Sequence, residues 1–168
     1  MIKEIYFAGG CFWGTQHYFK QIYGVIETAT GYANGKTENP VYEEVYTDMT
    51  GFAETVKVVY DSNRISLVLL VELFFKSIDP LSLNRQGNDV GTRYRTGIYY
   101  SDNDDLQTIK AVYEKVAAEY GSDLCVELEP LLNFYMAEEY HQDYLDKNPN
   151  GYCHLPTALF DFARKVNK

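Results

Sequence analysis

The stretch Ile-Tyr-Phe-Ala-Gly-Gly-Cys-Phe-Trp-Gly, residues 5–14, joins an apolar run to a helix-like segment through two glycines. Glycine lets the backbone turn sharply and keeps side-chain bulk away from Cys11, the next residue. If Cys11 lies at the first turn of the helix, unpaired N–H groups and the helix dipole favour its nucleophilic thiolate. Phe12 and Trp13, the single tryptophan, indicate a small apolar pocket that receives a substrate. A lone cysteine after a strand is, however, most often a small buried hydrophobe, so the rest of the sequence must decide.

Length and composition favour one domain over residues 1–168 with a real hydrophobic core, since 46% of the residues are hydrophobic. The net charge of −9 argues against nucleic acid and against an anionic membrane surface as partners. No apolar run reaches the roughly 20 residues that span a bilayer. The first residues do not have the pattern of a signal peptide, so we expect a cytoplasmic protein.

Cysteine usage points to reactivity rather than to structure. The three cysteines are Cys11, Cys125 and Cys153, and an odd number without an export signal argues against a disulfide framework. No two of them form a C-x-x-C pair. We therefore expect no metal site, although His154 follows Cys153 directly and His141 is nearby in sequence.

Periodicity predicts strands that interleave with helices but without a regular βαβ repeat. The expected fold is α+β: a two-layer α/β sandwich with a mixed sheet, helices packed on it, a ferredoxin-like core and a loop-rich C-terminal tail. The predicted strands cover 2–8, 25–33, 55–60, 95–100 and 124–129. The predicted helices cover 12–23, 67–76 (capped by Ser66), about 103–120 (ended by Gly121) and 137–146; the long loop is 79–94 and the tail 147–168.

Three polar side chains are candidates for chemistry. Glu54 follows Gly-Phe-Ala at the start of an alternating strand, where aromatic surroundings can raise its pKa and make it a proton donor. The ordinary alternative is a solvated charge. Tyr42 and Tyr94 lie on irregular segments rather than on a periodic core face, which favours hydroxyls that bind a polar oxygen.

These residues belong to a series of motifs that resembles the A-type peptide methionine sulfoxide reductases, a family specific for the S epimer of the sulfoxide. The motifs cover nearly the whole chain in order, and their combination is far more specific than any one of them. They are Gly-Cys-Phe-Trp-Gly (10–14), Gly-Tyr (31–32), Asn-Pro-Val-Tyr (39–42), Thr-Gly-Phe-Ala-Glu (50–54), Gln-Gly-Asn-Asp-Val-Gly-Thr-Arg-Tyr-Arg (86–95), Ala-Glu-Glu-Tyr-His-Gln-Asp-Tyr-Leu (137–145), Lys-Asn-Pro (147–149) and Gly-Tyr-Cys (151–153).

The resemblance implies a role for each matching residue. Cys11 corresponds to the nucleophile that attacks the sulfoxide sulfur, and Glu54 to the acid that protonates the sulfoxide oxygen. Cys153 corresponds to the recycling cysteine. The remaining matches are Tyr42 and Tyr94, whose hydroxyls hold the oxygen, Asp89 in the same polar cluster, and Phe12 and Trp13, which receive the S-methyl group.

The residue types suit this chemistry. Reducing a sulfoxide needs a soft nucleophile for sulfur and a proton for oxygen. The first step leaves Cys11 as a sulfenic acid, which a second thiol converts to a disulfide. An external dithiol, most simply thioredoxin, must then reduce the disulfide, and no bound cofactor is required. The expected enzyme repairs oxidised proteins as a monomer, with free and protein-bound methionine-S-sulfoxide as substrates.

The chain departs from the family at two positions, since Phe52 and Ile78 stand where histidine is usual. We expect drier surroundings for Glu54 as a result. Cys125 matches no functional position and is expected to be structural.

Two other functions fit part of the pattern. A thiol peroxidase could use Cys11 and Cys153 but would need no methyl pocket. A non-enzymatic module that binds methionine peptides would use the aromatic pocket but has no purpose for Glu54 or for a second mobile cysteine. Consumption of racemic methionine sulfoxide with dithiothreitol, compared with consumption of hydrogen peroxide, separates the three.

Overall fold

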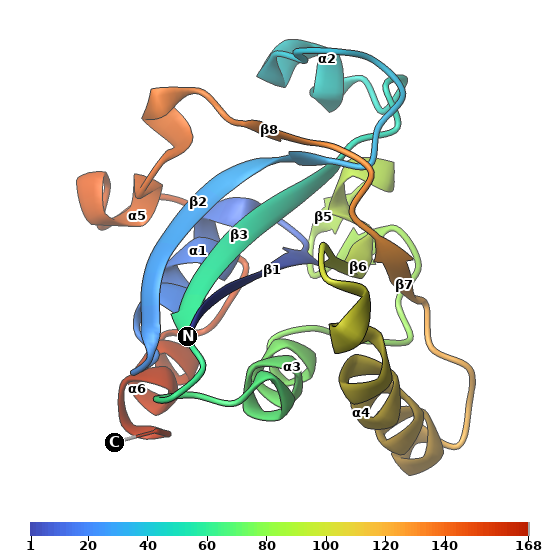
Figure 1. The fold of residues 1–168 in the computed structure, drawn as a ribbon. Helices are drawn as coiled ribbons and strands as arrows, with labels where there is room; N and C mark the ends of the chain where they lie inside the picture. The colour runs from blue at the N-terminus through green and yellow to red at the C-terminus, as the bar shows by residue number, and fades with distance from the viewer. Residues whose placement is uncertain (168) are drawn as a thin grey trace.

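A computed structural model describes residues 1–167 as a six-stranded mixed sheet with helices packed against it (Figure 1). The sheet order is β7-β6-β1-β3-β2-β8, and β4 and β5 form a separate small hairpin. The strands are β1 (Ile2–Gly9), β2 (Val25–Ala33), β3 (Ala53–Asp61), β4 (Arg85–Gln86), β5 (Asp89–Val90), β6 (Thr96–Tyr100), β7 (Val126–Pro130) and β8 (Phe134–Met136). The α-helices are α1 (Phe12–Lys20), α2 (Tyr42–Tyr46), α3 (Leu67–Lys76), α4 (Leu106–Tyr120), α5 (Tyr144–Lys147) and α6 (Thr157–Lys165).

Strand pairing brings distant parts of the sequence to one edge of the sheet. β1 runs antiparallel to β3 and to β6, and β2 runs antiparallel to β3. Gly9 at the end of β1 pairs with Thr96 at the start of β6, and Tyr32 near the end of β2 pairs with Glu54 at the start of β3. Residues that follow β1, begin β3 and precede β6 therefore meet at the same edge.

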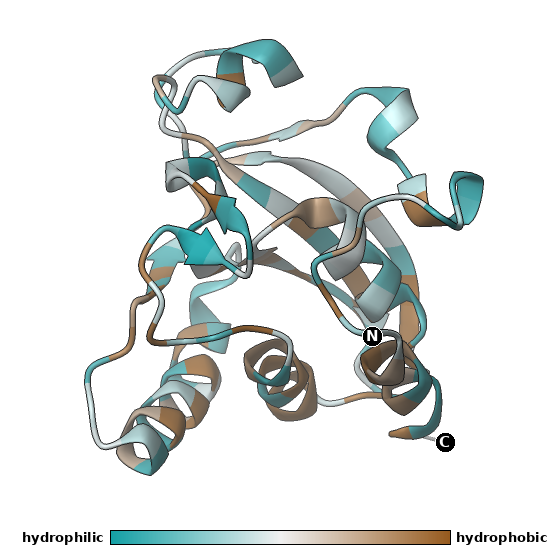
Figure 2. Cartoon of the chain, turned by 180° about the vertical axis from the view of Figure 1, so that it is seen from behind, coloured by the Kyte–Doolittle hydropathy of each residue, from teal (hydrophilic) through white to brown (hydrophobic). Residues whose placement is uncertain are grey.

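The two faces of the sheet are covered differently. Alternate residues of β1 show this, because Ile5 and Phe7 join the large core beneath the helices. Tyr6 and Ala8 join a smaller cluster on the other face, against which the segment before β8 packs. The sequence of α3 is almost entirely apolar, and the helix is brown along most of its length in Figure 2. The mixed sheet with one helical layer confirms the predicted α+β class.

Several predicted boundaries are also confirmed. The Ser66 hydroxyl accepts a hydrogen bond from the Leu69 amide at 3.1 Å and caps α3. Gly121 ends α4 with φ +64°, a left-handed conformation that glycine adopts without strain. The first predicted helix ends at Lys20 rather than at Tyr23.

Other predictions for the C-terminal third were wrong. The tail 147–168 was expected to be loop-rich, yet residues 157–165 form α6, which contacts α1. Lys168, the last residue of this predicted tail, lies outside the described residues. The predicted helix 137–146 is broken into a 3₁₀ turn and the short α5, because Asp143 between them is left-handed with φ +52°. The hairpin of β4 and β5 within the predicted loop, and the short β8, were missed.

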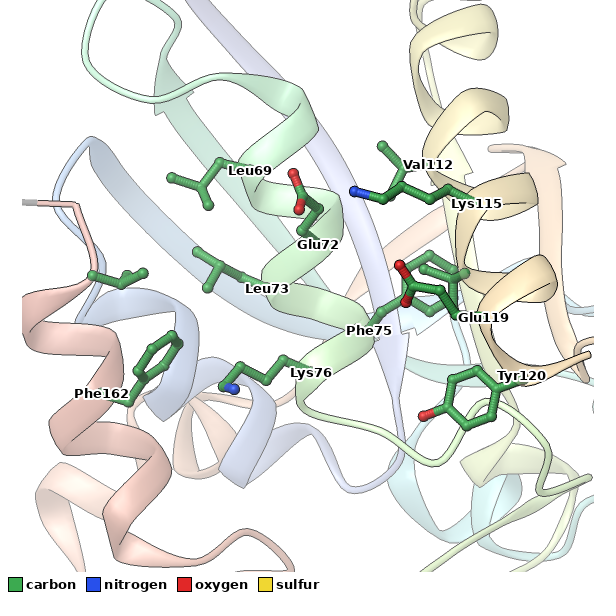
Figure 3. Close-up of a pocket in the computed structure, with 12 residues that line it drawn as sticks. Leu69, Glu72, Leu73, Phe75, Lys76, Val112, Lys115, Glu119, Tyr120 and Phe162 are labelled. Carbon is green, nitrogen blue, oxygen red and sulfur yellow. The ribbon is translucent and has the colours of Figure 1, made fainter.

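A groove of about 360 Å³ separates α3, α4 and α6 on the helical layer (Figure 3). Its lining is apolar with charged rims, including Glu72, Lys76 and Lys115. None of its twelve lining residues is a cysteine or histidine, so the chemistry predicted from the sequence does not lie there. Within residues 1–167, no helix has the length and apolar character needed to cross a membrane.

The core depends on one aromatic stack. The ring of Phe7 lies between Phe19 and Phe74, with ring centroids 4.8 and 4.9 Å away and nearly parallel planes. We expect Phe7→Ala to lower the free energy of unfolding by about 3–5 kcal/mol, because it removes a fully buried ring and leaves a cavity. Urea unfolding measures this loss. Leu132→Ala, at an exposed position, is the control and should change stability by no more than about 0.5 kcal/mol.

Candidate active site

Cys11 lies between the end of β1 and the first residue of α1, as the glycines around it predict. Gly10 has φ +89°, so the turn into the helix requires a glycine. Cys11 is the residue immediately before the helix, and its carbonyl accepts a hydrogen bond from the Thr15 amide at 3.4 Å. Its side chain is only 6% exposed.

The protonation state of Cys11 differs from the sequence-based expectation. Burial, followed by the nearby Glu54 carboxyl, raises the pKa of the Cys11 thiol well above its ordinary value. The Trp13 backbone amide at the helix start acts in the opposite direction but is the weaker influence. The resting residue is therefore a thiol, because loss of solvation outweighs the short helix that follows it.

Glu54 is the buried carboxyl of the site. Its carboxylate is buried, with 2% of the residue exposed, and its Oε1 accepts a hydrogen bond from the Phe12 amide at 3.2 Å. Burial raises its pKa from 4.5 to about 8, although the Phe12 amide and the Arg93 guanidinium act to lower it. At neutral pH the group is mostly protonated, which is the state a proton donor needs.

Two residues to which the sequence analysis gave no role in the site, His141 and Tyr144, pack against its aromatic wall. Trp13 donates its indole N–H to His141 Nδ1 at 3.0 Å and stacks on Tyr144, with ring centroids 3.7 Å apart and planes within 12°. His141 also packs against Phe12 at a centroid distance of 5.2 Å. Both belong to the 137–145 motif, so the signal was present, but a motif does not say which of its members face the site.

The two predicted tyrosines reach the same place from different elements. Tyr42 opens α2, and its amide donates to Glu138 at 2.9 Å. Tyr94 precedes β6, and the Arg93 guanidinium lies 4.4 Å from its ring centroid. Burial, followed by the charge of Glu54, raises the pKa of both phenols, that of Tyr42 to about 12. Both hydroxyls therefore carry their protons at neutral pH.

Asp89 and the recycling-cysteine segment complete the group. Asp89 comes from β5 and accepts a hydrogen bond from the Tyr152 hydroxyl at 2.9 Å. Cys153 is the next residue after Tyr152. Its Sγ would lie 3.1 Å from a Cβ added to Gly14, which is one helical turn after Cys11. The charge of a Cys153 thiolate contributes to raising the pKa of Cys11, so the two sulfurs lie within electrostatic range. All three cysteines are free.

The remaining sequence-based candidates lie around this site rather than in it. The Phe52 ring packs on Gly35 and edge-on to Tyr135, and Ile78 packs beside Gly9. The drier surroundings expected for Glu54 from these two residues stay a prediction. Cys125 precedes β7 and donates its amide to the Pro80 carbonyl at 2.7 Å. Within residues 1–167, no three His, Cys, Asp or Glu side chains are grouped to hold a metal ion.

The predicted residues converge on one small cavity of about 70 Å³. It is lined by Cys11, Phe12, Trp13, Tyr42, Glu54, Asp89, Tyr94 and Tyr152. Among the sequence-predicted site residues, only Cys153 does not line it; it lines a neighbouring groove of about 680 Å³ together with residues of α1, α5 and α6. A thiol and a protonated carboxyl that share a cavity with an aromatic wall define a thiol-based oxidoreductase.

Comparison with known proteins gives the particular family. Residues 3–167 match the family described as peptide methionine sulfoxide reductase. The peptide methionine sulfoxide reductase MsrA of Lachnoclostridium phytofermentans is 53% identical over 99% of this chain and 100% of its own, and that of Clostridium acetobutylicum is 54% identical over 94% and 98%. The chain therefore belongs to the peptide methionine sulfoxide reductases and is an enzyme that reduces methionine sulfoxide.

Solved structures agree with this assignment. Mxr1 of Saccharomyces cerevisiae in its reduced form has a TM-score of 0.87 and 40% identity, with 93% of this chain and 90% of that chain covered. Methionine sulfoxide reductase A of Corynebacterium diphtheriae has a TM-score of 0.82 and 38% identity, with 90% and 77% covered.

The burial of Glu54 predicts a pH-dependent stability. Its pKa is higher in the folded chain (about 8) than the ordinary 4.5, so its contribution to stability is complete below about pH 4.5 and is lost as pH rises through 8. Glu54→Gln removes this titration. As pH rises from 5 to 9, the free energy of unfolding of the variant should therefore increase relative to that of the unmodified chain, as measured by urea unfolding. A constant difference across this range would show that the carboxyl is solvated.

Proposed function

We propose that this enzyme reduces methionine-S-sulfoxide, free and in proteins, by transferring the sulfoxide oxygen to Cys11. The observation that carries the proposal is that the Cys11 thiol and the protonated Glu54 carboxyl share one small cavity. A nucleophile for sulfur and a proton for oxygen are the two groups that sulfoxide reduction needs.

The first step balances without an outside electron donor. The Cys11 sulfur attacks the sulfoxide sulfur while Glu54 gives its proton to the sulfoxide oxygen, and the thiol proton returns to the Glu54 carboxylate. The S–O bond of the sulfoxide breaks and an S–O bond forms at Cys11. Methionine leaves reduced by two electrons, and Cys11 becomes a sulfenic acid.

The cavity walls divide the substrate between polar and apolar contacts. The hydroxyls of Tyr42 and Tyr94 hold the sulfoxide oxygen, and Asp89 belongs to the same polar side of the cavity. Phe12 and Trp13 receive the S-methyl group, and Tyr144 and His141 fix the orientation of the indole. This apolar wall favours a sulfoxide over a peroxide, which needs no methyl site.

The second half-reaction uses Cys153. Its thiol condenses with the Cys11 sulfenic acid to give a disulfide and water, and thioredoxin then reduces the disulfide. Support comes from the position of Cys153 beside the first turn of α1, and from a structure of yeast Mxr1 in complex with Trx2 that has a TM-score of 0.61 and 27% identity, with 85% of this chain and 84% of that chain covered.

Some wider expectations stay predictions. They are repair of oxidised proteins as the biological role, a cytoplasmic monomer as the working state, independence from bound cofactors, and a single catalytic domain over residues 1–168. We also infer a ferredoxin-like core, because the chain order β1-α1-β2-β3-α3-β6 combines with the sheet order β6-β1-β3-β2.

The proton-donor role of Glu54 can be tested by substitution. In single turnovers, Glu54→Gln should slow methionine formation by about 10²–10⁴-fold at pH 7, because an amide cannot give up a proton. The unmodified enzyme should lose rate as pH rises through about 8, where Glu54 ionises. A variant that retains its rate to within about twofold would transfer the donor role to Tyr42 and Tyr94. Cys11→Ser is the matched negative control and should form no methionine.

The recycling role of Cys153 predicts a separation of the two half-reactions. Cys153→Ser should still form one equivalent of methionine and leave a Cys11 sulfenic acid that dimedone traps. Turnover with thioredoxin should collapse, whereas dithiothreitol should restore part of it. Cys125→Ser is the control and should change neither half-reaction. Thioredoxin-driven turnover that persists without Cys153 and fails without Cys125 would assign the resolving role to Cys125.

A further inference from the structure

His154, the residue after Cys153, is seated against the turn that carries the nucleophile. Its Nε2 lies 3.0 Å from the Gly9 carbonyl oxygen at the end of β1. Two glycines leave room for the ring, because a Cβ on Gly10 would lie 3.3 Å from Nε2 and a Cβ on Gly14 would lie 2.9 Å from Nδ1. The imidazole therefore fills the space between β1 and the first turn of α1.

The contact with the Gly9 carbonyl determines which ring nitrogen of His154 carries the proton. A carbonyl oxygen only accepts hydrogen bonds, so Nε2 must be the N–H that donates to Gly9. Burial lowers the pKa of His154 below 6.5, so the ring is neutral at pH 7. In a neutral imidazole the other nitrogen, Nδ1, then carries a lone pair. Nδ1 is buried and has no hydrogen-bond partner within residues 1–167.

The Cys153 thiol and this lone pair both lie close to Gly14, and the thiol requires a base. A Cβ added to Gly14 would lie 3.1 Å from the Cys153 Sγ and 2.9 Å from the His154 Nδ1. The hydrogen bonds of the sulfur are with its own loop, to the Leu155 amide and carbonyl, each at 3.4 Å. Burial, opposed by the Leu155 amide and supported by the charge of Asp89, raises the pKa of Cys153. At pH 7 the group is a thiol, and a thiol attacks a sulfenic acid poorly.

We propose that His154 is the general base of the resolving step, taking the Cys153 proton on Nδ1 while Nε2 remains bonded to the Gly9 carbonyl. This rests on the proposed resolving role of Cys153. The Cys153 sulfur attacks the Cys11 sulfur, the S–S bond forms and the S–O bond of the sulfenic acid breaks. The proton on Nδ1 passes to the departing hydroxide, which leaves as water, so the imidazole ends the step neutral.

The charged and titratable groups around this base are few. Asp89 of the β4–β5 hairpin is the one whose charge acts on His154. Cys11 lies on the turn before α1, and Tyr152 precedes the pair on the same loop. The groove beside Cys153 adds His17 of α1, Asp146 of α5, and Asp161 and Arg164 of α6. Of these, His17 is the only alternative imidazole, and it makes an ion-pair contact with Asp146 at 3.5 Å when protonated.

His154→Gln separates the role of the side chain as a base from its hydrogen bond to the Gly9 carbonyl. A glutamine amide N–H can replace the Nε2–H donor to Gly9, but the side chain has no basic nitrogen. His17→Gln is the matched control on the other side of the groove. Each reduced protein is mixed with one equivalent of methionine-S-sulfoxide and quenched over time, and methionine, dimedone-trapped sulfenic acid and the Cys11–Cys153 disulfide are quantified by mass spectrometry.

We expect His154→Gln to form methionine at the unmodified rate and to accumulate sulfenic acid. Disulfide formation should be slower by at least about 10²-fold at pH 7, the usual contribution of a general base. The unmodified rate should be flat above pH 7 and fall only below the lowered histidine pKa. The variant rate should rise about tenfold per pH unit as hydroxide takes over the deprotonation of Cys153. His17→Gln should match the unmodified chain.

Two results would overturn the proposal for His154 while leaving the role of Cys153 intact. One is disulfide formation within about twofold of the unmodified rate in His154→Gln. The other is a loss of rate that does not change with pH, which would mean that the ring only seats the loop. An unmodified enzyme that forms no Cys11–Cys153 disulfide after one turnover would instead contradict the resolving role itself, and with it the need for a base.

Discussion

The antiparallel pairing of β1 with β3 and β6 is the constraint on which the site depends. It places the second residue after β1, the second residue of β3 and the second residue before β6 at one edge of the sheet. Cys11, Glu54 and Tyr94 are 40 or more positions apart in the sequence, yet this register alone brings them together. Because the strands on both sides are hydrogen-bonded, a shift of one residue would turn Glu54 to the other face.

Desolvation then sets the chemistry at that edge. The same burial that raises the pKa of Cys11 raises that of Glu54, so at pH 7 these two groups are neutral acids rather than two anions. A neutral site accepts a neutral sulfoxide without burying a net charge.

The sequence was sufficient to predict five of the six strands of the sheet and to name residues that line one cavity. Alternation predicted β3 and an apolar run indicated β1, and the motifs around the strand ends named the residues that meet there. It was insufficient where long-range contacts decide local structure. β8 has three residues and exists because it pairs with β2. By contrast, α6 had a readable signal, since Pro156 precedes it and Leu159, Phe160, Ala163 and Val166 have helical spacing.

Protonation states could not be read from the sequence either. The helix after Cys11 predicted a stabilised thiolate, but the structure buries the sulfur almost completely, and the cost of desolvating a charge exceeds the effect of nine helical residues. The assignment of His141 and Tyr144 to the Trp13 wall likewise required the turn at Asp143, whose left-handed conformation breaks the helix that periodicity predicts.

One short segment, the turn from Gly9 to Gly14, serves both halves of the proposed reaction. The Phe12 amide donates to Glu54 on one side of the turn, and the Gly9 carbonyl accepts from His154 on the other. The nucleophile between them is thus flanked by the acid needed for the first step and by the loop that carries the resolving thiol. Glycine at positions 10 and 14 is required by this second role as well as by the turn, because a side chain at either position would meet the His154 ring. The glycines that first marked the cysteine as reactive also provide the space in which its partner cysteine is seated.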